Sequence, residues 1–572
     1  MRFSFALIAP FALALAACAD NPAPQITAPT AITAGAVSSA DPRATAAGEA
    51  ILAQGGSATD AAIAVMLALT VVEPQSSGIG GGGFMLHAEG TNGTLTTIDG
   101  RETAPAAATP TRFLDPQGKV LGRDARVFSG LSVGIPGNIA LAAEAHAKHG
   151  ALPWAALFQP AITLARDGFT MNRRLHESLA ANKGRADRSE TARAVFFGAD
   201  GNPLPIGATV TIPALAETLT TLGEAGPAAM YGSTAAAALA AYVAGETPQD
   251  GRMTAADVTA YAAKERAPVC APYRTYRICG MGPPSSGGVA VAQMLGQLEG
   301  FDIAALGPQN PQFWHLFVES QRLAYADREL YSGDADFVAV PTDGLVDAGY
   351  IRQRGALIAL GTTLTTVEAG VPPGAPLARG DGPEEPESGT THFSVVDSAG
   401  NAVSYTSTIE GAFGSGLYWG GFYLNNELTD FTLTPDENGK LVANRVEGGK
   451  RPRSSMAPTI VYDRDGRIVL VIGAAGGPTI PVQVARSIIG VVDFGMTAKA
   501  ALGLPFIMSF GDAVLIEEGS ALEAMEADLK ALGHANIRKG APPLKANALR
   551  HLPSGGWEIA VDPRLNGKLD YK

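Results

Sequence analysis

The pattern of apolar and polar residues changes character near residue 389. Before that point helical periods prevail, beginning with residues 45–54 and 58–73, which a pair of glycines separates. The second segment is apolar on almost all sides, which is typical of a core helix. Ser57 and Asp60 have the spacing of a capping box at its start. Further helices are predicted within about 133–265 and at 312–328.

Strand patterns prevail after residue 389. They occupy residues 390–397, 402–410 and 417–431, and a further pair within 457–474 leads through a glycine turn into a helix. An earlier hairpin is predicted at 84–99. Because strands and helices occur on both sides of residue 389, we expect one layered body whose sheets combine both parts.

Residues 78–83 contain Gly78-x-Gly80-x-x-Gly83, which is the spacing of a dinucleotide-binding turn. Such a turn has to follow a strand and open a helix. Here a helix comes before the glycines and a hairpin comes after them. We therefore expect the glycines to permit close approach of backbone segments instead.

Composition narrows the class of protein. The 572 residues are 46% hydrophobic and 17% charged, which indicates a folded chain too long for one ordinary core. The net charge of -13 argues against a nucleic-acid partner. Small-molecule chemistry is therefore expected. The eight histidines show no metal-binding spacing, so no metal site is predicted.

Residues 1–17 have the features of a secretory signal: one early cation, a short apolar run and small residues. The segment LAAC at 15–18 resembles a bacterial lipobox, which favours lipidation of Cys18 over ordinary cleavage. We expect an exported bacterial protein that is periplasmic or is held at the membrane through a lipid anchor alone. Cys270 and Cys279 flank a short symmetric segment, and a disulfide and two buried thiols remain equally compatible with the sequence.

The segment 370–389 carries five prolines and five glycines, so we expect an exposed, mobile linker. Thr390 and Thr391 open a strand pattern directly after it. A threonine hydroxyl is a weak nucleophile until a base takes its proton. Cleavage of the Gly389–Thr390 bond would supply an α-amine as that base, with an ordinary pKa of about 7.7 to 8.0. The alternative is a pair of ordinary strand threonines.

Nine segments resemble the γ-glutamyltransferase (γ-glutamyl transpeptidase) family of N-terminal-nucleophile hydrolases. They follow the family's order from about residue 44 to 564: VVEPQSSGIGGGGF, DGRETAP, SVGIPG, PPSSGG, RLAYADR, TTHFSVVD, LNNELTDF, GKRPRSSMAPTI and DPR. The resemblance implies an α+β fold, a four-layer αββα sandwich built jointly by two subunits from one precursor. The large subunit would comprise residues 18–389 and the small subunit residues 390–572, associated as a heterodimer.

The resemblance also implies roles for individual residues. Thr390 would be the nucleophile, both for self-cleavage after Gly389 and for acyl transfer through a γ-glutamyl ester. The implied acyl transfer needs no cofactor. Thr408 would hydrogen-bond Thr390, and the amides of Gly476 and Gly477 would form the oxyanion hole. Ala474-Ala475 precede this glycine pair in place of the family's more usual Ser-Pro.

A γ-glutamyl group displays an α-carboxylate and an α-ammonium, so its site needs a cationic fork and a set of acceptors. Arg101 matches the family's carboxylate-binding arginine. The matching hydroxyl partners are Ser454 and Ser455, and the matching ammonium acceptors are Glu427 and Asp430. Glu410 stands where many members have asparagine and adds a further negative charge.

These implications predict a self-cleaving γ-glutamyl hydrolase and transpeptidase that acts on glutathione and related amides. One alternative is an acylase for glutaryl side chains such as those of cephalosporins. A glutaryl group lacks the ammonium, so the acids of the pocket would remain without their cation. A second alternative is an uncleaved, surface-anchored binding protein, against which the intact Thr390 and Thr408 argue.

Overall fold

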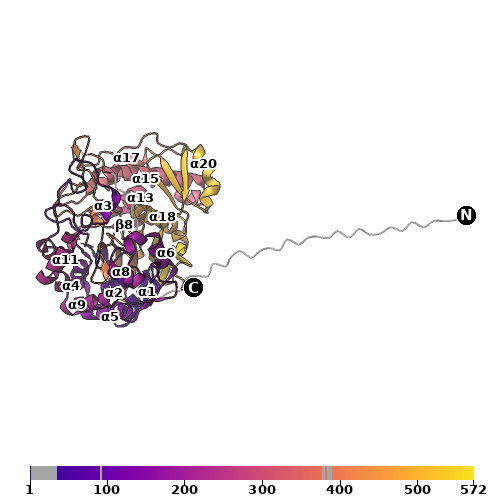
Figure 1. The fold of residues 1–572 in the computed structure, drawn as a ribbon. Coiled ribbons are helices and arrows are strands. Elements are labelled where there is room, and N and C mark those ends of the chain that lie inside the picture. Colours follow the sequence, from indigo (N-terminus) through magenta and orange to yellow (C-terminus); the bar gives the residue numbers. More distant parts are fainter. Residues whose placement is uncertain (2–34, 91–92, 377–379, 383–388, 572) are drawn as a thin grey trace.

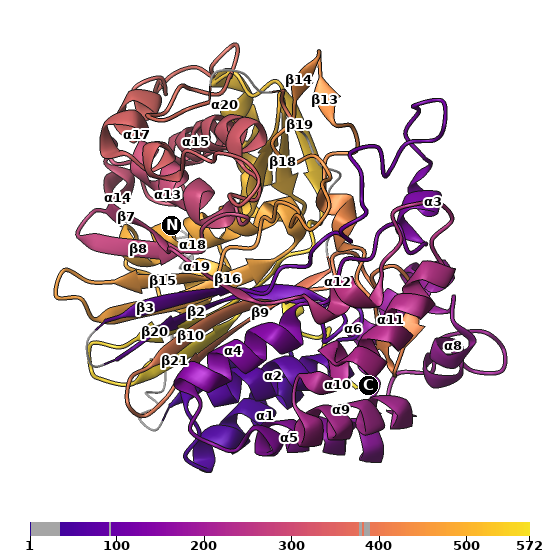
Figure 2. The same cartoon turned by 90° about the vertical axis from the view of Figure 1, so that its left-hand side faces the viewer.

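The computed structural model describes residues 35–90, 93–376, 380–382 and 389–571, together with Met1. They form four layers, in which two six-stranded sheets lie face to face between outer layers of helices (Figure 1 and Figure 2). The predicted signal segment 1–17 and Cys18 lie outside the described residues, as do positions 377–379 and 383–388 of the predicted linker. Within the described part of the chain, no helix is both long and apolar enough to span a bilayer.

The first sheet has the strand order β1-β9-β10-β2-β3-β6. Thr390 begins β9, which pairs antiparallel with β1 on one side and with β10 on the other. A strand that follows residue 389 thus lies between strands from both parts of the chain, which confirms the predicted shared sheet. The strands are β1 (Ala36–Ser39), β2 (Gly82–Ala88), β3 (Leu95–Asp99), β6 (Lys264–Arg266), β9 (Thr390–Val396) and β10 (Ala402–Thr408).

The second sheet has the order β21-β20-β16-β15-β8-β7 and also combines both parts of the chain. Its β7–β8 hairpin places Cys270 opposite Cys279, and the two are joined by a disulfide. The structure therefore selects the disulfide from the two alternatives that the sequence left open. The strands are β7 (Val269–Tyr273), β8 (Tyr276–Gly280), β15 (Thr459–Tyr462), β16 (Ile468–Ala475), β20 (Lys545–His551) and β21 (Trp557–Val561).

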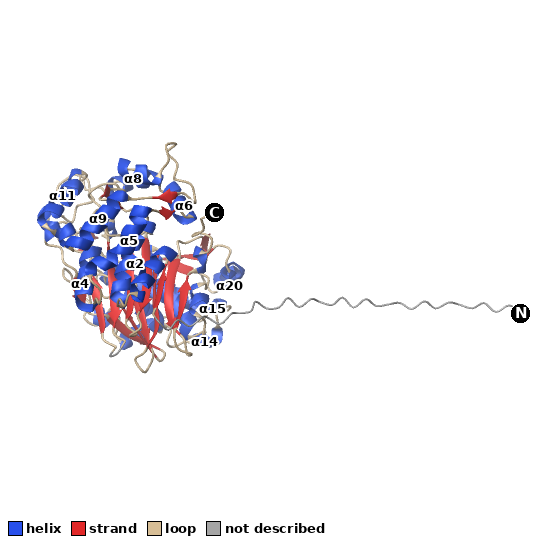
Figure 3. Cartoon of the chain, turned by 90° about the horizontal axis from the view of Figure 1, so that it is seen from below, coloured by secondary structure: helices blue, strands red, loops and turns tan. Residues whose placement is uncertain are grey.

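Helices cover the outer faces of both sheets (Figure 3). On the first sheet, α2 packs against α1 and α5 and against β9 and β10, so every one of its residues is buried. The predicted capping box of Ser57 and Asp60 is present at its start. This layer contains α1 (Pro42–Ala53), α2 (Ala58–Val72), α4 (Asn138–His149), α5 (Trp154–Asp167) and α9 (Pro213–Ala225). The opposite layer contains α13 (Gly287–Gln297), α15 (Pro311–Tyr331), α17 (Ala348–Gly355) and α18 (Ile480–Val492).

Shorter elements complete the described chain. A separate three-stranded sheet consists of β17 (Ile507–Phe510), β18 (Ala513–Glu517) and β19 (Asn536–Gly540). Small strand pairs are β4 (Phe169–Thr170) with β5 (Thr209–Val210), β11 (Tyr418–Trp419) with β12 (Phe422–Tyr423), and β13 (Asp436–Glu437) with β14 (Lys440–Leu441). The remaining helices are α3 (Arg123–Val127), α6 (Arg173–Ala181), α7 (Lys183–Ala186), α8 (Glu190–Phe196), α10 (Ala228–Tyr231), α11 (Ser233–Gly245), α12 (Ala255–Thr259), α14 (Ile303–Leu306), α16 (Thr342–Leu345), α19 (Ala498–Leu502) and α20 (Glu526–Ala531).

The predicted strand at 417–431 is only partly a strand. After the β11–β12 hairpin the chain turns into a short 3-10 helix at Glu427–Asp430. The Asn425 side chain bonds the backbone of Gly80 and Gly134, and Asn426 accepts from the amide of Gly411. The backbone amides of Asn425, Asn426 and Leu428 donate to the carbonyl oxygens of Gly80, Ile409 and Ser132. They are therefore not available to pair with a neighbouring strand.

The glycines at 78–83 follow α2 and lead into β2, whose first two residues are Gly82 and Gly83, so they do not open a helix. A Cβ added to Gly80 would lie 2.1 Å from the carbonyl oxygen of Tyr423. At Gly81 it would lie 1.9 Å from the carbonyl oxygen of Thr408. Both positions therefore need glycine because another backbone segment passes too close for any side chain.

Candidate active site

One pocket collects most of the residues that the sequence singled out. It lies where β9 begins, where β10 ends, and beside the turn that follows β16. Its lining comprises Arg101, Thr390, Thr408, Glu410, Asp430, Ser454, Ser455, Met456, Gly477, Pro478 and Ile480. Glu427 lies behind this lining in contact with Arg101, and Gly476 precedes Gly477 in the turn.

Thr390 and Thr408 are opposite each other in the β9–β10 register. The Thr390 hydroxyl donates to Thr408 Oγ1 at 3.2 Å, and Thr408 Oγ1 donates to the carbonyl oxygen of Gly389 at 3.3 Å. The amide of Glu410 donates to the same Thr408 oxygen at 2.8 Å. Thr408 thus connects the candidate nucleophile to the carbonyl of the peptide bond that precedes it.

The turn after β16 is held rigidly by its own side chains. Gly476 and Gly477 both have positive φ, at 128° and 57°. Thr479 Oγ1 donates to the Gly476 carbonyl at 2.9 Å, and the Gln483 amide donates to the Ala475 carbonyl at 2.7 Å. The glycine pair therefore keeps a fixed backbone beside the pocket, even though Ala474-Ala475 precede it.

Ser454 and Ser455 reach the pocket from the segment before β15. The backbone of Ser454 bonds Pro284 and Ser286, at 3.1 Å and 2.8 Å. Arg328 on α15 donates to Ser455 Oγ at 2.6 Å. No role was predicted for Arg328, although it lies in the RLAYADR segment that carries the family resemblance.

Arg101 is 1% exposed and is held from several sides. Its guanidinium donates to the carbonyl oxygens of Pro452 at 3.2 Å and Arg453 at 2.9 Å. It also forms ion pairs with Glu427 and Asp430. Burial disfavours the charged guanidinium, but these carboxylates raise the pKa of Arg101 above its ordinary value.

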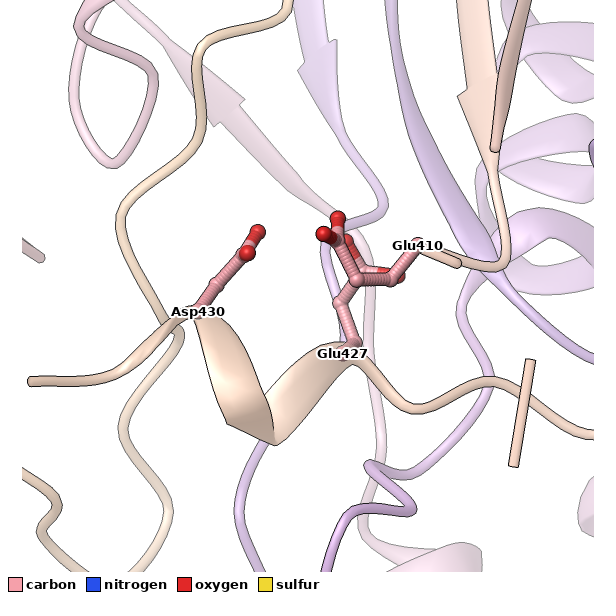
Figure 4. A group of neighbouring side chains, drawn as sticks. All are labelled: Glu410, Glu427 and Asp430. Carbon is pink, nitrogen blue, oxygen red and sulfur yellow. The ribbon is translucent and has the colours of Figure 1, made fainter. Parts of the chain in front are cut away.

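The carboxyl groups of Glu410, Glu427 and Asp430 offer oxygen atoms that all lie within 4.8 Å of one another. Figure 4 shows Glu427 and Asp430 on one turn, with Glu410 extending toward Glu427 from a separate segment. The Arg101 guanidinium already supplies positive charge here, so a metal ion would meet a like charge. The three carboxylates are better suited to bind an ammonium group. Its N–H groups can donate to the carboxylate oxygens while Arg101 stays in place.

The sequence predicted separate sides for the arginine and the acids, whereas the structure brings them into direct contact. A buried charge without a partner is costly, so opposite charges pair when no substrate separates them. The cavity volume of the pocket is about 20 Å³, which is room for roughly one water molecule. Arg101 and the acids therefore occupy most of this small pocket themselves.

Glu102 is a further buried acid at this site, with 0% exposure, and it was not among the predicted site residues. It directly follows Arg101 in the DGRETAP segment. The sequence offered one signal for Glu102, which is its place directly after Arg101, the predicted carboxylate-binding residue. Its carboxyl group lies against that of Glu427.

The chain is similar to known proteins over most of its length. The family model described as gamma-glutamyltranspeptidase matches residues 44–571. The glutathione hydrolase proenzyme of Bacillus subtilis (strain 168) is 38% identical over 547 residues, which covers 93% of this chain and 90% of the relative. The acylase ACY 1 proenzyme of Pseudomonas sp. (strain V22) is 34% identical over 535 residues, which covers 92% and 91%. Two differently named activities thus occur among relatives at similar identity.

The fold is shared with solved structures. The crystal structure of cephalosporin acylase from Bacillus halodurans is similar with a TM-score of 0.81 at 25% identity, covering 96% of this chain and 97% of that chain. The predicted α+β sandwich of the N-terminal-nucleophile hydrolase type is therefore confirmed.

Proposed function

The chain belongs to the gamma-glutamyltranspeptidase family, and from that premise we propose that it is a self-cleaving γ-glutamyl hydrolase and transpeptidase acting on glutathione and other γ-glutamyl amides. The observation that carries the proposal is the set of carboxylates beside Arg101, next to Thr390. A γ-glutamyl group presents one carboxylate and one ammonium, and this pocket contains partners for both. The relative named a glutathione hydrolase supports the same assignment.

Self-cleavage would begin with attack of the Thr390 hydroxyl oxygen on the Gly389 carbonyl carbon. The Thr408 hydroxyl, at 3.3 Å from the Gly389 oxygen, is placed to stabilise the charge that develops there. The C–N bond breaks, the nitrogen takes the hydroxyl proton, and an ester joins Gly389 to Thr390 Oγ1. Water then hydrolyses this ester and leaves Thr390 with a free α-amine. The small cavity of the uncut chain supports the view that cleavage has to open the pocket.

Acyl transfer would use the same oxygen. The Thr390 α-amine takes the hydroxyl proton while the oxygen attacks the γ-carbonyl of the substrate. Amides of Gly476 and Gly477 would stabilise the oxyanion, where removal of one such donor typically costs about 100- to 1,000-fold in rate. The leaving amine takes the proton, and water or an acceptor amine then releases the glutamyl group from the ester.

Substrate recognition would divide the pocket between two charges. Arg101 would bind the α-carboxylate with help from the hydroxyls of Ser454 and Ser455. Glu410, Glu427 and Asp430 would bind the α-ammonium. Because Arg101 contacts two of these acids in the closed pocket, an incoming substrate has to insert its own opposite charges between them.

Comparison of two anilides tests this function. Processed protein should hydrolyse a γ-glutamyl anilide at least about 100-fold faster, in kcat/KM, than the matching glutaryl anilide. The reason is that the glutaryl group leaves buried acceptors without a charged donor. The Thr390→Ala variant serves as the blank.

Equal or reversed rates would instead support the second candidate, a glutaryl-type acylase. The names of two relatives favour that candidate, since one is called an acylase and one a cephalosporin acylase. The number of acids in the pocket argues against it. A non-catalytic binding protein of the same fold is the weakest candidate, because it has no need of the Thr390–Thr408 contact.

Gly389→Ala should slow self-cleavage about 10- to 100-fold. A Cβ at this position would lie 2.3 Å from the carbonyl oxygen of Glu410, so the scissile carbonyl has to move away from Thr408. A time course of the full-length band on a denaturing gel measures the effect. Gly361→Ala, where a Cβ meets nothing within 4 Å, is the matched control. Wild-type cleavage rates in Gly389→Ala would contradict the proposed geometry.

The two products should remain associated after cleavage. Strands β9 and β10 lie among β1, β2 and β3 of the first sheet, and β15, β16, β20 and β21 adjoin β8 and β7 in the second. Separation of the subunits would break both sheets. Export through residues 1–17 and lipidation of Cys18 are part of the proposal and rest on the sequence pattern.

A further inference from the structure

Glu102 is fully buried next to Arg101, which lines the candidate pocket. Its side chain is enclosed by two glycines, since a Cβ on Gly82 would lie 2.5 Å from Glu102 Oε2 and a Cβ on Gly134 would lie 2.6 Å from Glu102 Cβ. It does not line the pocket and cannot reach a substrate directly. Any effect on substrates has to act through a neighbour.

That neighbour is Glu427. Neither carboxyl oxygen of Glu102 has a hydrogen-bond donor among the described residues, and the same holds for Glu427 Oε2. The two carboxyl groups lie within hydrogen-bonding reach of each other, so the oxygen atoms that lack a donor belong to neighbouring carboxyl groups. Two carboxylates in contact in a buried site cannot both be ionised without a large cost, and a single proton between them removes it. Burial raises the pKa of both groups, and Arg101 only partly offsets this.

The other charges that face the pair leave this conclusion unchanged. Arg101 contributes one positive charge, and Asp430 and Glu410 contribute two negative charges. Three buried tyrosines also interact electrostatically with Glu102, and burial raises the pKa of each hydroxyl, so they stay neutral near pH 7: Tyr231, Tyr261 and Tyr405. One positive charge thus faces four carboxyl groups. A proton bound to one of these carboxyl groups lowers the net negative charge of the site.

We infer that Glu102 and Glu427 share one proton in the empty pocket, and that release of this proton selects substrates that carry an α-ammonium. The inference rests on the proposed function. Glu102 is a positioning residue in this account, because it sets the charge of Glu427 and touches no substrate.

The shared proton gives the binding of γ-glutamyl and glutaryl substrates opposite dependences on pH. When an α-ammonium enters beside Glu427, one positive charge enters and the shared proton leaves to solvent. Binding of a γ-glutamyl substrate therefore becomes stronger as rising pH removes the proton in advance. A glutaryl substrate brings no cation, so it binds better while the proton is present and worse after it has gone.

The test is the ratio of kcat/KM for the γ-glutamyl anilide to that for the glutaryl anilide, measured in the processed enzyme between pH 5 and pH 8. Titration of the Thr390 α-amine affects both substrates alike and cancels in the ratio. We expect the ratio to rise at least tenfold over this range. In Glu102→Gln the amide donates permanently to Glu427, so the ratio should change less than threefold.

Two further variants keep the result decisive. Glu427→Gln replaces the other carboxyl group of the pair, so the ratio should again change little with pH. This variant replaces Glu102→Gln in the test if Glu102→Gln fails to fold. Glu410→Gln removes one pocket carboxylate but leaves the pair intact. It should lower the ratio at every pH and keep the tenfold rise.

The outcomes distinguish the shared proton from the proposed function. An enzyme that prefers the γ-glutamyl anilide by a ratio constant from pH 5 to pH 8 keeps the proposed function and overturns the shared proton. A rise that persists in both Glu102→Gln and Glu427→Gln overturns it as well. Failure to hydrolyse the γ-glutamyl anilide at any pH would instead remove the proposed function itself.

Discussion

Thr390→Ala is expected to leave one full-length chain and to lower hydrolysis of a γ-glutamyl anilide by about 10⁴-fold or more. The side chain would lose the oxygen that attacks the Gly389 carbonyl, and the same oxygen forms the acyl ester. Both losses come from one atom, so they should appear together. A denaturing gel and an anilide assay on the same preparation measure them.

Thr391→Val is the matched control for this result. Thr391 is the next residue of β9 and points to the other face of the strand, where its buried hydroxyl has no hydrogen-bond partner among the described residues. Valine keeps its shape, so cleavage and hydrolysis should both persist. Thr390→Ser should also keep both, since it retains the hydroxyl. Spontaneous appearance of two bands in Thr390→Ala would disprove the assignment of the nucleophile.

Arg101→Lys is expected to raise KM for the γ-glutamyl anilide about 100-fold, while the chain still cleaves itself. The guanidinium donates in several fixed directions at once, to two backbone carbonyls and to two carboxylates. An ammonium group cannot reproduce that planar set of donors. Loss of charged hydrogen bonds worth about 1.5 to 3 kcal/mol accounts for an effect of this size. Steady-state kinetics on the processed protein separates KM from kcat.

Arg266→Lys provides the comparison for the loss of a largely buried, ion-paired arginine elsewhere in the fold. Arg266 pairs with Asp99 and Asp336 and does not line the substrate pocket. We expect it to lower the thermal midpoint and to leave KM within about twofold. If Arg101→Lys changed KM no more than Arg266→Lys does, Arg101 would not bind the substrate carboxylate.

Much of the fold was predictable because it depends on residues that are close in sequence. The capping box at Ser57 and the buried helix after it follow from spacing and apolar content, and both are present. The hairpin of β2 and β3 and the long helix α15 were predicted for the same reason. At the site, the Gly- and Pro-rich segment before Thr390 left an ordinary strand threonine as an alternative, and the family resemblance was needed to single out Thr390 as the candidate nucleophile.

The family resemblance extended the prediction to site residues that are far apart in the chain. It could not predict which of these side chains contact each other or which of them carry a proton. The segment at Glu427–Asp430 became a turn because Asn425 and Asn426 bond distant backbone groups. The disulfide depended on the register of β7 and β8, which sets its two cysteines opposite each other.

The sequence by itself thus determined the local elements and the two-part sheet, and its family resemblance singled out Thr390 as the candidate nucleophile. Tertiary structure alone decided that Arg101 contacts the acids it was expected to face across a substrate, and that Glu102 lies against Glu427. The physical reason is that burial sets both outcomes. In a site closed to water, each charge must find a partner or lose its charge, and which partner is near depends on segments that are hundreds of residues apart.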